Sequence, residues 1–374
     1  MRILLDYRPA LRSRSGVGEY VHQLVRHLAG TCPGDELTLF TSSWKDRPDA
    51  TLAAAWPDVR VSDHRVPVAL LNLAWHNLEW PPVEWLAAGD PEVVFSPHPL
   101  LTPSRRAAQV VMIHDLDFLD HPERAPREIG RDYPRLAPSH ARRAARVIVP
   151  SRYTAGEVGR RFDIPADRIH VCAQGAPAWP APVEAPTPGH GFILFMGTLE
   201  PRKNIGTLLS AYERLRARHA NSPRLVLAGS AGIGSRAWLD AIARPPLAGH
   251  VEHLGYVPDE DRQRLYGGAR VLVLPSLDEG FGMPALEAMS LGVPVVASNR
   301  GALPEVVGDA GVLVSPDDAD ALADAIGRVL SDDTLAEALS LRGRARARRF
   351  DWDATARTVR AVFEEAANTR AHRN

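Results

Sequence analysis

Short apolar runs alternate with longer segments of helical periodicity along most of the chain. The runs are apolar almost throughout and rich in Val and Ile, which is typical of strands buried on both faces in parallel sheets covered by helices. We predict strands at residues 3–5, 37–40, 93–95, 110–113, 147–149, 192–196, 225–228, 251–254, 271–274, 293–297 and 312–314.

Between these runs, apolar residues recur at the i, i+3, i+4 spacing of one helix face. The spacing predicts a helix over residues 20–28, which Gly30 is placed to end, and further helices over 208–215 and 322–330. The repetition of strand, helix and strand favours the α/β class with doubly wound sheets.

About eleven strands are more than one open sheet comfortably holds. The composition changes abruptly at residues 177–190, where repeated prolines suit an extended linker and neither a helix nor a central strand. We therefore predict an N-terminal Rossmann-like domain at 1–176 and a second one at 191–350, facing each other across a cleft. A last helical segment, 353–374, is expected to pack back on the first domain.

Composition and charge argue against a nucleic-acid-binding protein, a disulfide-stabilised protein and a zinc-binding protein. The 374 residues are 45% hydrophobic and 24% charged, and 44 basic against 45 acidic residues give a net charge of -1, so no nucleic-acid partner is expected. Two cysteines without CxxC spacing indicate neither a disulfide framework nor a zinc site.

Neither a signal peptide nor a membrane-spanning run is predicted, and we expect a cytoplasmic protein. Arginine clusters at 142–146 and 342–349 leave peripheral contact with the inner face of the membrane as an open alternative. Solvated arginine-rich helix faces are the favoured interpretation of both clusters.

In open α/β sheets, ligands bind beyond the carboxyl ends of the strands. Gly16 and Gly18 follow the first strand and precede a helix, where a glycine backbone can approach a phosphate or sugar. A plain glycine turn explains them equally well. The missing third glycine, and the absence of an acidic residue after the next predicted strand, count against NAD.

His114 and Asp115 follow the predicted strand 110–113. Such a pair can orient an imidazole toward a ligand. A histidine bonded to a loop carbonyl is the alternative.

Arg202 and Lys203 follow the strand predicted at 192–196 and stand just before a helix that Asn204 is placed to cap. Adjacent cations beside helix N–H groups suit a diphosphate. Cations are unfavourable near the positive end of a helix unless an anion compensates them, which favours a function over a merely solvated pair.

The segment after the predicted strand 271–274 carries two glutamates, Glu279 and Glu287. Pro284 suits the first helical position and Gly292 the left-handed residue past the helix end. Glu279 then lies at the mouth of the sheet and Glu287 one turn inside the helix, so that one carboxylate could bind a sugar and the other a ribose.

Glu279 and Glu287, with seven residues between them in the frame Glu-Gly-Phe-Gly-Met-Pro-Ala-Leu-Glu, resemble the paired-glutamate motif of the family-4 retaining glycosyltransferases. Segments 195–205, 292–298 and 303–307 resemble the rest of that family's donor domain. The opening, 5–8 with 15–20, and residues 113–116 look like a bacterial subset enriched in mannosyltransferases.

The resemblance implies the GT-B fold and a role for each matching residue. Arg202 and Lys203 would bind the donor diphosphate, Glu287 the ribose and Glu279 the donor sugar. The further donor contacts it implies are His114 on the sugar, the backbone of Phe281, Gly282 and Met283 beside it, Gly16 and Gly18 from the other domain, and Tyr256 and Val257 beside the base. The first loop reads Ser-Gly-Val-Gly at 15–18 and differs here from the adjacent glycine pair common in the family.

The implied activity is retaining, metal-independent transfer of a hexose without a cofactor, in polysaccharide or glycoconjugate biosynthesis. We expect GDP-mannose as donor first, a UDP- or dTDP-hexose second, and a saccharide or lipid-linked acceptor. Two alternatives stay open: a nucleotide-sugar epimerase of the same fold, and a non-catalytic carbohydrate-binding relative. The latter should have lost one of Arg202, Lys203, Glu279 or Glu287, and all four are present.

Overall fold

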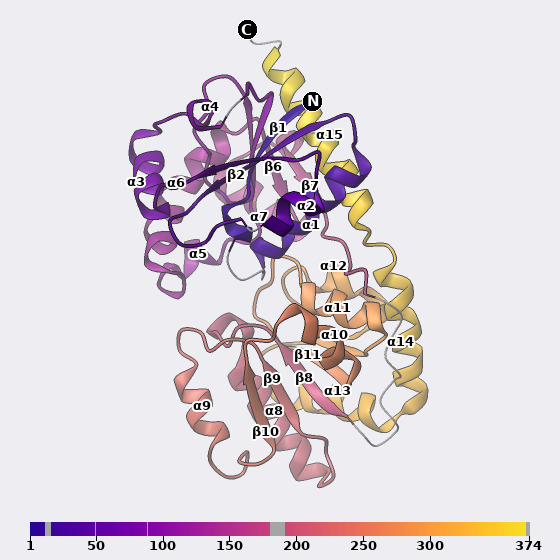
Figure 1. The fold of residues 1–374 in the computed structure, drawn as a ribbon. Coiled ribbons are helices and arrows are strands. Elements are labelled where there is room, and N and C mark those ends of the chain that lie inside the picture. Colours follow the sequence, from indigo (N-terminus) through magenta and orange to yellow (C-terminus); the bar gives the residue numbers. More distant parts are fainter. Residues whose placement is uncertain (12–15, 49, 88, 180–190, 372–374) are drawn as a thin grey trace. The chain divides into compact units, whose positions relative to one another are not determined.

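A computed structural model describes residues 1–11, 16–48, 50–87, 89–179 and 191–371. The chain divides into two compact units, residues 1–175 with 351–374 (unit 1) and residues 176–350 (unit 2) (Figure 1). Most of the predicted linker, 180–190, lies outside the described residues. None of the helices in the described ranges is long and apolar enough to cross a membrane.

Unit 1 is built on a sheet of seven parallel strands in the order β3-β2-β1-β4-β5-β6-β7. Its strands are β1 (Arg2–Asp6), β2 (Glu36–Ser42), β3 (Arg60–His64), β4 (Val93–Ser96), β5 (Ala108–Met112), β6 (Arg146–Val149) and β7 (Ile169–Val171). Its helices are α1 (Val17–Thr31), α2 (Ala50–Ala55), α3 (Val68–Leu78), α4 (Val83–Leu86), α5 (Asp117–Asp120), α6 (Arg127–Arg143), α7 (Arg152–Phe162) and α15 (Trp352–Ala371).

Both faces of this sheet are covered, which explains why its strands are apolar throughout. Ile3 and Leu5 point into a core shared with α1 and α15, whereas Leu4 points into another core with α3. Successive side chains of a strand leave opposite faces, so each strand supplies both cores.

Unit 2 repeats this topology with six parallel strands in the order β10-β9-β8-β11-β12-β13. Its strands are β8 (Phe192–Met196), β9 (Leu225–Ala228), β10 (Val251–Gly255), β11 (Ala269–Leu274), β12 (Val295–Ser298) and β13 (Val312–Val314). Its helices are α8 (Ile205–Arg218), α9 (Arg236–Ile242), α10 (Asp259–Gly267), α11 (Met283–Leu291), α12 (Leu303–Val307), α13 (Ala319–Ser331) and α14 (Asp333–Ala347).

In each unit the strand order reverses once, between β1 and β4 and between β8 and β11. Loops that leave these two neighbouring strands turn to opposite sides and leave a crevice between them, where ligands of doubly wound sheets bind. We therefore expect a ligand-binding site at each of the two crevices.

The structure confirms the predicted strands and adds β3 and β7. Strand β3 escaped prediction because it reads Arg-Val-Ser-Asp-His and is only partly buried at the sheet edge. Gly30 does not end α1, which runs on to Thr31 because Gly30 adopts no left-handed conformation. Gly292, at φ 77°, does end α11 as predicted, although that helix begins at Met283, one residue before Pro284.

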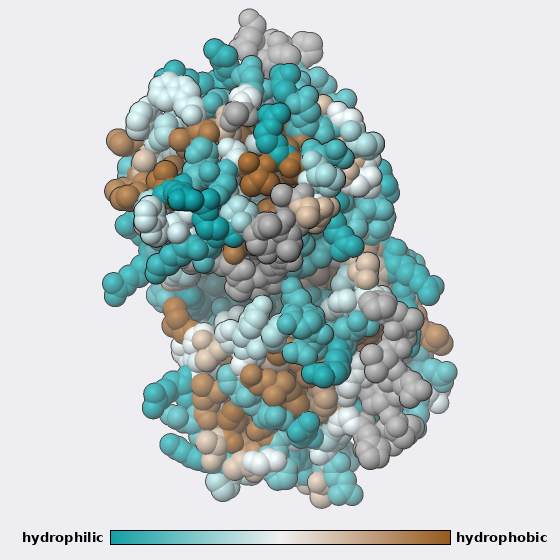
Figure 2. All heavy atoms as spheres, viewed as in Figure 1, coloured by the Kyte–Doolittle hydropathy of each residue, from teal (hydrophilic) through white to brown (hydrophobic). Residues whose placement is uncertain are grey.

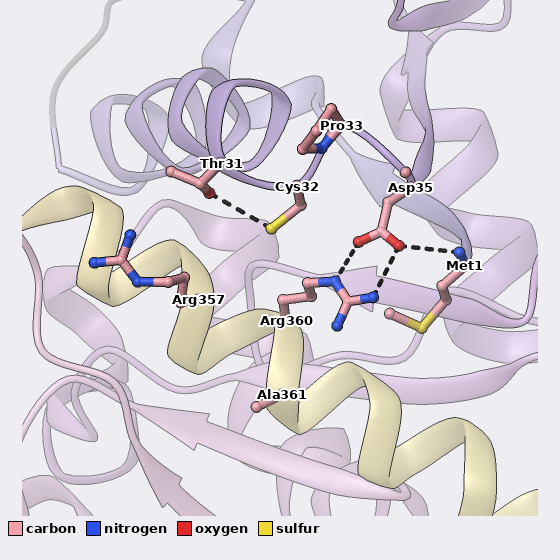
Figure 3. Close-up of a pocket in the computed structure, with 9 residues that line it drawn as sticks. Met1, Thr31, Cys32, Pro33, Asp35, Arg357, Arg360 and Ala361 are labelled. Atoms are coloured by element: carbon pink, nitrogen blue, oxygen red, sulfur yellow. Dashed lines mark hydrogen bonds and ion pairs between the residues drawn. The ribbon is translucent and has the colours of Figure 1, made fainter.

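Helix α15 is held on unit 1 by apolar packing and by polar contacts, among them an ion pair with the buried carboxylate of Asp35. Val359 and Phe363 enter the core beside α1. At the amino end of β1, the Asp35 carboxylate accepts hydrogen bonds from Arg360 Nε at 2.6 Å and from the amine of Met1 at 2.9 Å (Figure 3). Burial would raise the pKa of Asp35, but both cations more than offset it and the pKa is lowered.

These groups line a pocket of about 480 Å³. It lies at the amino ends of parallel strands, the edge opposite to the one where such sheets bind ligands. We interpret it as a structural junction.

We predict that Arg360→Ala lowers the free energy of unfolding by about 1–3 kcal/mol, because it leaves a buried acceptor short of a donor. Chemical denaturation would measure this, with Arg357→Ala as the control. Arg357 is 59% exposed and lies 3.7 Å from Asp351, so its loss should change stability by under about 0.5 kcal/mol.

The effect should depend on pH in one direction. The pKa of Asp35 is lowered on folding, so its contribution is present above the ordinary pKa of an aspartate and lost as pH falls below it. The stability gap between the native protein and Arg360→Ala should therefore shrink in acid. A gap that widens would contradict the assignment.

Candidate active site

Two loops meet at the crevice of unit 2. One leaves β8 and forms a short turn over Pro201–Lys203; the other leaves β11 and reaches Glu279. The amide of Leu277 donates to the carbonyl of Arg202 at 2.7 Å and joins the two loops. They lie side by side because β8 and β11 are paired neighbours although they are distant in sequence.

This junction brings together three residues that the sequence predicts as catalytic. The Lys203 ammonium donates to Glu279 Oε1 at 2.6 Å, and Arg202 Nη1 donates to Oε2 at 3.3 Å. The hydroxyl of Ser276 donates to Oε1 at 2.8 Å. Lys203 and Glu279 are both buried, and each compensates the other's charge.

The Glu279 carboxyl is ionised at neutral pH. Burial would raise its pKa, but Lys203 and Arg202 outweigh burial and lower it. An ionised carboxylate is purely an acceptor with about four lone-pair positions. Lys203, Arg202 and Ser276 occupy three of these, and the remaining capacity suits the hydroxyl of a sugar.

Asn204 does not cap α8 through its side chain, and that prediction is wrong. Its backbone is left-handed, at φ 59°, and its amide instead donates to the carbonyls of Pro275 at 3.1 Å and Pro316 at 2.7 Å. Asn204 thus ties the loops after β8, β11 and β13. The first turn of α8 has no side-chain cap, so it favours an anion.

Glycines fix the path of the Glu279 loop. At Gly301 a side chain would put Cβ 2.7 Å from the amide nitrogen of Glu279, and Gly282 has φ 112° at the start of α11. The Phe281 ring is buried and meets Phe350 edge-on at 5.8 Å. Its backbone, rather than its ring, is therefore the part suited to contact a ligand, as expected for residues 281–283; Met283 is the first residue of α11.

Glu287 lies buried on α11 and is held by two residues of α10 that the sequence analysis missed. Its Oε1 accepts from Arg262 Nη2, and its Oε2 accepts from the Tyr266 hydroxyl at 2.6 Å. Burial raises the pKa of Glu287 while Arg262 and Tyr266 oppose the rise. Two lone-pair positions stay available, which matches the two hydroxyls of a ribose.

Arg262 and Tyr266 have the i, i+4 spacing of one helix face. That spacing is visible in the sequence, but nothing there indicates that α10 packs against α11. Their contact with Glu287 is a product of the tertiary fold.

Tyr256 and Val257 are not brought to this cluster. They line a separate pocket of about 360 Å³ together with Asp261 and Arg264. These two α10 residues lie on the face opposite to Arg262 and Tyr266. The role of Tyr256 and Val257 beside a base stays a prediction.

In unit 1, the predicted residues gather where α1 begins. Gly16, at φ 54°, is the residue before α1 and Gly18 is buried in its first turn, while Ser15 lies outside the described residues. The His114 ring meets Tyr20 edge-on at 5.1 Å.

His114 is neutral at physiological pH. Its Nε2 lies 3.2 Å from the carbonyl oxygen of Pro97, the loop bond named as the alternative. Burial lowers its pKa to about 4, although Asp115 acts in the opposite direction.

The crevice of unit 1 holds a polar pocket of about 410 Å³ that the sequence analysis did not assign. At its base, buried Asp6 accepts from Arg8 Nε at 2.8 Å and Nη2 at 2.7 Å, and His98 Nε2 lies 3.1 Å from Asp6. Burial would raise the pKa of Asp6, but Arg8 and His98 hold it well below its ordinary value. The Asp-Tyr-Arg sequence, in which Asp6 is the last residue of β1, was the signal in the sequence that could have indicated this pocket.

Helices α3 and α6 form another wall of this pocket. Arg8 Nη1 donates to the Asn72 side chain at 2.8 Å, and Asn72 donates to Glu128 at 2.7 Å. Ligand atoms of His76, Glu128 and Asp132 lie within 4.8 Å of one another, as in a metal site. However, Arg131 holds both oxygens of Asp132, so a metal ion would face a guanidinium, and we interpret the group as a hydrogen-bonded wall.

Two family models match successive parts of this chain. The model described as Glycosyltransferase Family 4 matches residues 14–178, and the one described as Glycosyl transferases group 1 matches residues 182–346. O-antigen chain mannosyltransferase B of Escherichia coli is 33% identical over 96% of this chain and 99% of its own. The chain belongs to the family-4 glycosyltransferases.

Other relatives agree. The MMP alpha-(1->4)-mannosyltransferase of Mycolicibacterium hassiacum is 33% identical over 60% of this chain and 55% of its own. Among solved structures, sucrose-phosphate synthase from Thermosynechococcus elongatus has a TM-score of 0.78 at 23% identity, covering 97% of this chain and 98% of that chain. HepE of Anabaena in complex with UDP and glucose has a TM-score of 0.69 at 19% identity, and the match covers 96% of this chain and 98% of that chain.

These findings confirm the predicted fold class, two Rossmann-like domains of the GT-B kind. They also show that this family-4 member is a glycosyltransferase, which favours sugar transfer over the epimerase and the non-catalytic alternative. The role of each site residue stays a prediction.

If Glu287 binds the ribose, Glu287→Ala should weaken a free nucleoside diphosphate at least about tenfold, because a hydrogen bond to a charged group contributes roughly 1.5–3 kcal/mol. Calorimetry with the diphosphate and its 2′-deoxy form tests this, and the deoxy form should lose less. Glu252→Ala, an exposed pair with Arg224 in the same unit, is the control. Unchanged nucleotide affinity in Glu287→Ala would exclude the role.

Tyr266→Phe tests how Glu287 is held. The Tyr266 bond lowers the pKa of Glu287, so its loss should raise that pKa further. Nucleotide binding needs the ionised carboxylate. As the pH is lowered, Tyr266→Phe should therefore lose nucleotide affinity at a higher pH than the native protein does. A merely structural role would leave the pH profile in place.

Proposed function

We propose that this glycosyltransferase moves mannose from GDP-mannose to a saccharide or lipid-linked acceptor in polysaccharide or glycoconjugate biosynthesis. The observation that carries the proposal is the cluster of Arg202, Lys203 and Glu279 at the crevice of unit 2, where cations meet an uncapped helix start. Mannose is the sugar named in two of the relatives, one matching 96% of this chain and the other 60%.

In the proposed reaction, Lys203 and Arg202 stabilise the diphosphate as it leaves. Their fixed positive charge lies in a largely buried site, where electrostatic stabilisation is strongest. Glu279 accepts a hydroxyl of the sugar, and Glu287 accepts the ribose hydroxyls. Further donor contacts are proposed for His114, Gly16 and Gly18.

The transfer we propose retains the anomeric configuration and needs no metal. The bond between the anomeric carbon and the diphosphate oxygen breaks, and the acceptor oxygen forms a bond to that carbon on the same face. The acceptor proton goes to a diphosphate oxygen. Two cations and helix N–H groups support this proposal, because they supply the charge that a divalent ion supplies elsewhere.

We further propose that the polar pocket of unit 1 receives the acceptor. It lies at the carboxyl ends of parallel strands and offers both donors and acceptors of hydrogen bonds, as sugar hydroxyls require. The Arg8 guanidinium, packed 4.7 Å over the ring of Trp75, is rigidly placed to take part.

With GDP-mannose as donor, we expect turnover to exceed that with UDP-glucose, to survive EDTA, and to give a product with the anomeric configuration of the donor. Thermal shift with the two donors and NMR of the fresh product measure these outcomes. Stabilisation at a ligand concentration one hundred times Kd is about 2.7 kcal/mol. A preference for UDP-glucose, loss of activity in EDTA or an inverted product would each contradict the matching part of the proposal.

The same assay tests the leaving-group role. Arg202→Ala should lower kcat more than it weakens nucleoside binding, since the guanidinium acts on charge that grows in the transition state. Arg300→Ala, an exposed pair with Asp317 in the same unit, should keep kcat.

For the acceptor pocket, Asn72→Ala should raise KM for the acceptor several-fold and leave KM for the donor unchanged. Asn77→Ala is a matched control on the same helix, since Asn77 is exposed and bonds only the carbonyl of Leu73 among the described contacts. Equal acceptor KM in both variants would remove the pocket from the reaction.

A further inference from the structure

Helix α3 turns two of its polar residues toward the interior of unit 1. Leu70 and Leu73 are exposed, and apolar side chains lie on the surface over α3 in Figure 2. Asn72 and His76, one helical turn apart, instead line the polar pocket of unit 1. An amphipathic helix normally turns its polar residues to solvent. The reversed arrangement indicates that Asn72 and His76 have a function in the pocket.

Asp132 determines which ring nitrogen of His76 carries a hydrogen. Arg131 Nε and Nη2 donate to the two carboxylate oxygens of Asp132 at 2.7 and 2.8 Å, and Arg131 holds the pKa of Asp132 well below its ordinary value. An ionised carboxylate only accepts hydrogen bonds. The Nδ1 of His76, 2.8 Å from Asp132 Oδ2, therefore carries the hydrogen and donates it.

The other ring nitrogen of His76, Nε2, has a lone pair. Burial lowers the pKa of His76, although Asp132 acts in the opposite direction, so the imidazole is neutral at neutral pH. A neutral imidazole with its hydrogen on Nδ1 accepts at Nε2. None of the residues that the structure describes donates to this atom, and the His76 side chain is only 8% exposed. A nearly buried acceptor without a donor is costly, which points to a ligand.

The second imidazole of the pocket, His98, has no such capacity. The amide of Leu100 donates to His98 Nδ1 at 3.3 Å, and His98 Nε2 lies 3.1 Å from the ionised carboxylate of Asp6. Both nitrogens of His98 are therefore bonded within the protein. Of the two imidazoles in the described pocket lining, His76 is the one that can accept a hydrogen bond from a ligand.

Glu128 provides another acceptor beside His76. A ring nitrogen of His76 and a carboxylate oxygen of Glu128 lie within 4.8 Å of each other. Glu128 Oε1 accepts from Asn72 at 2.7 Å, and no described contact gives its Oε2 a donor. Two acceptors this close favour a ligand that donates hydrogen bonds. Sugar hydroxyls donate, whereas the oxygens of a phosphodiester only accept.

We propose that His76 is a specificity-determining residue of the acceptor pocket, whose Nε2 accepts a hydrogen bond from a sugar hydroxyl of the acceptor. The pocket binds a saccharide through its hydroxyls, and the phosphate of a lipid-linked acceptor stays outside it. Asp132 is a positioning residue, because it acts on the ligand only through the His76 ring. The inference rests on the proposed acceptor role of this pocket and adds the chemical class that it recognises.

The test is long-range proton–nitrogen NMR of the full chain with histidine labelled at its ring nitrogens, which distinguishes a protonated from an unprotonated nitrogen. The His76 signals are assigned from their loss in His76→Asn. We expect the hydrogen on Nδ1, and a saturable shift of the Nε2 signal with methyl α-mannoside, α-glucoside or α-galactoside. The fully O-methylated glycosides and dimethyl phosphate should leave this signal unchanged, because they have no hydrogen to donate.

Two variants separate ligand binding from a structural role of His76. An Asn side chain can bond Asp132 but has no atom at the place of Nε2, whereas the longer Gln side chain can put its amide oxygen there. We expect His76→Asn to weaken glycoside binding roughly two- to twelvefold, as for one neutral hydrogen bond, and His76→Gln to recover part of the loss. Nucleoside diphosphate affinity should stay unchanged. His121→Gln is the matched control, since His121 bonds Glu123 at 3.1 Å outside the pocket.

The proposal is overturned if Nε2 of His76 carries the hydrogen in the native chain, or if none of the three glycosides shifts its signal. It is also overturned if the O-methylated glycosides or dimethyl phosphate shift that signal equally. These native-chain signals decide the question even where a variant does not fold. No donor is used, so transfer from GDP-mannose with an unchanged His76 signal would remove this inference alone, and a shifted signal without such transfer would remove only the donor assignment.

Discussion

The buried ion pair between Lys203 and Glu279 is the interaction on which the donor-side site depends. It joins the loops of two strands that are adjacent in the sheet and distant in sequence. Taking both charges out of water is costly, and removing either one would leave the other uncompensated. Arg202 and Ser276 add further hydrogen bonds to the carboxylate, and Arg202 is also paired with Glu200 at 2.8 Å.

Unit 1 also has a buried carboxylate paired with a cation at its crevice. Asp6 and Arg8 lie where the strand order reverses there, and His98 completes the contact. One topology thus places a buried carboxylate–cation pair at the crevice of both units, because the reversal between neighbouring strands is where loops separate and leave room. Different surrounding residues give the two crevices different chemistry.

The two faces of helix α10 contribute to two different sites. Arg262 and Tyr266 hold Glu287, while Asp261 and Arg264 line the separate pocket that contains Tyr256. Neighbouring residues of a helix point about a quarter turn or more apart, so segments close in sequence can serve separate sites. Residue spacing alone therefore does not show which predicted contacts share a ligand.

The sequence by itself determined the doubly wound class, most strands and the grouping of Arg202, Lys203 and Glu279, because buried parallel strands are continuous apolar runs and ligand residues follow their carboxyl ends. It misplaced Asn204, whose left-handed backbone turns the amide toward neighbouring loops, and it missed Arg262, Tyr266 and the Asp6–Arg8 pocket. Only the tertiary structure decided these, since each depends on which distant elements pack together.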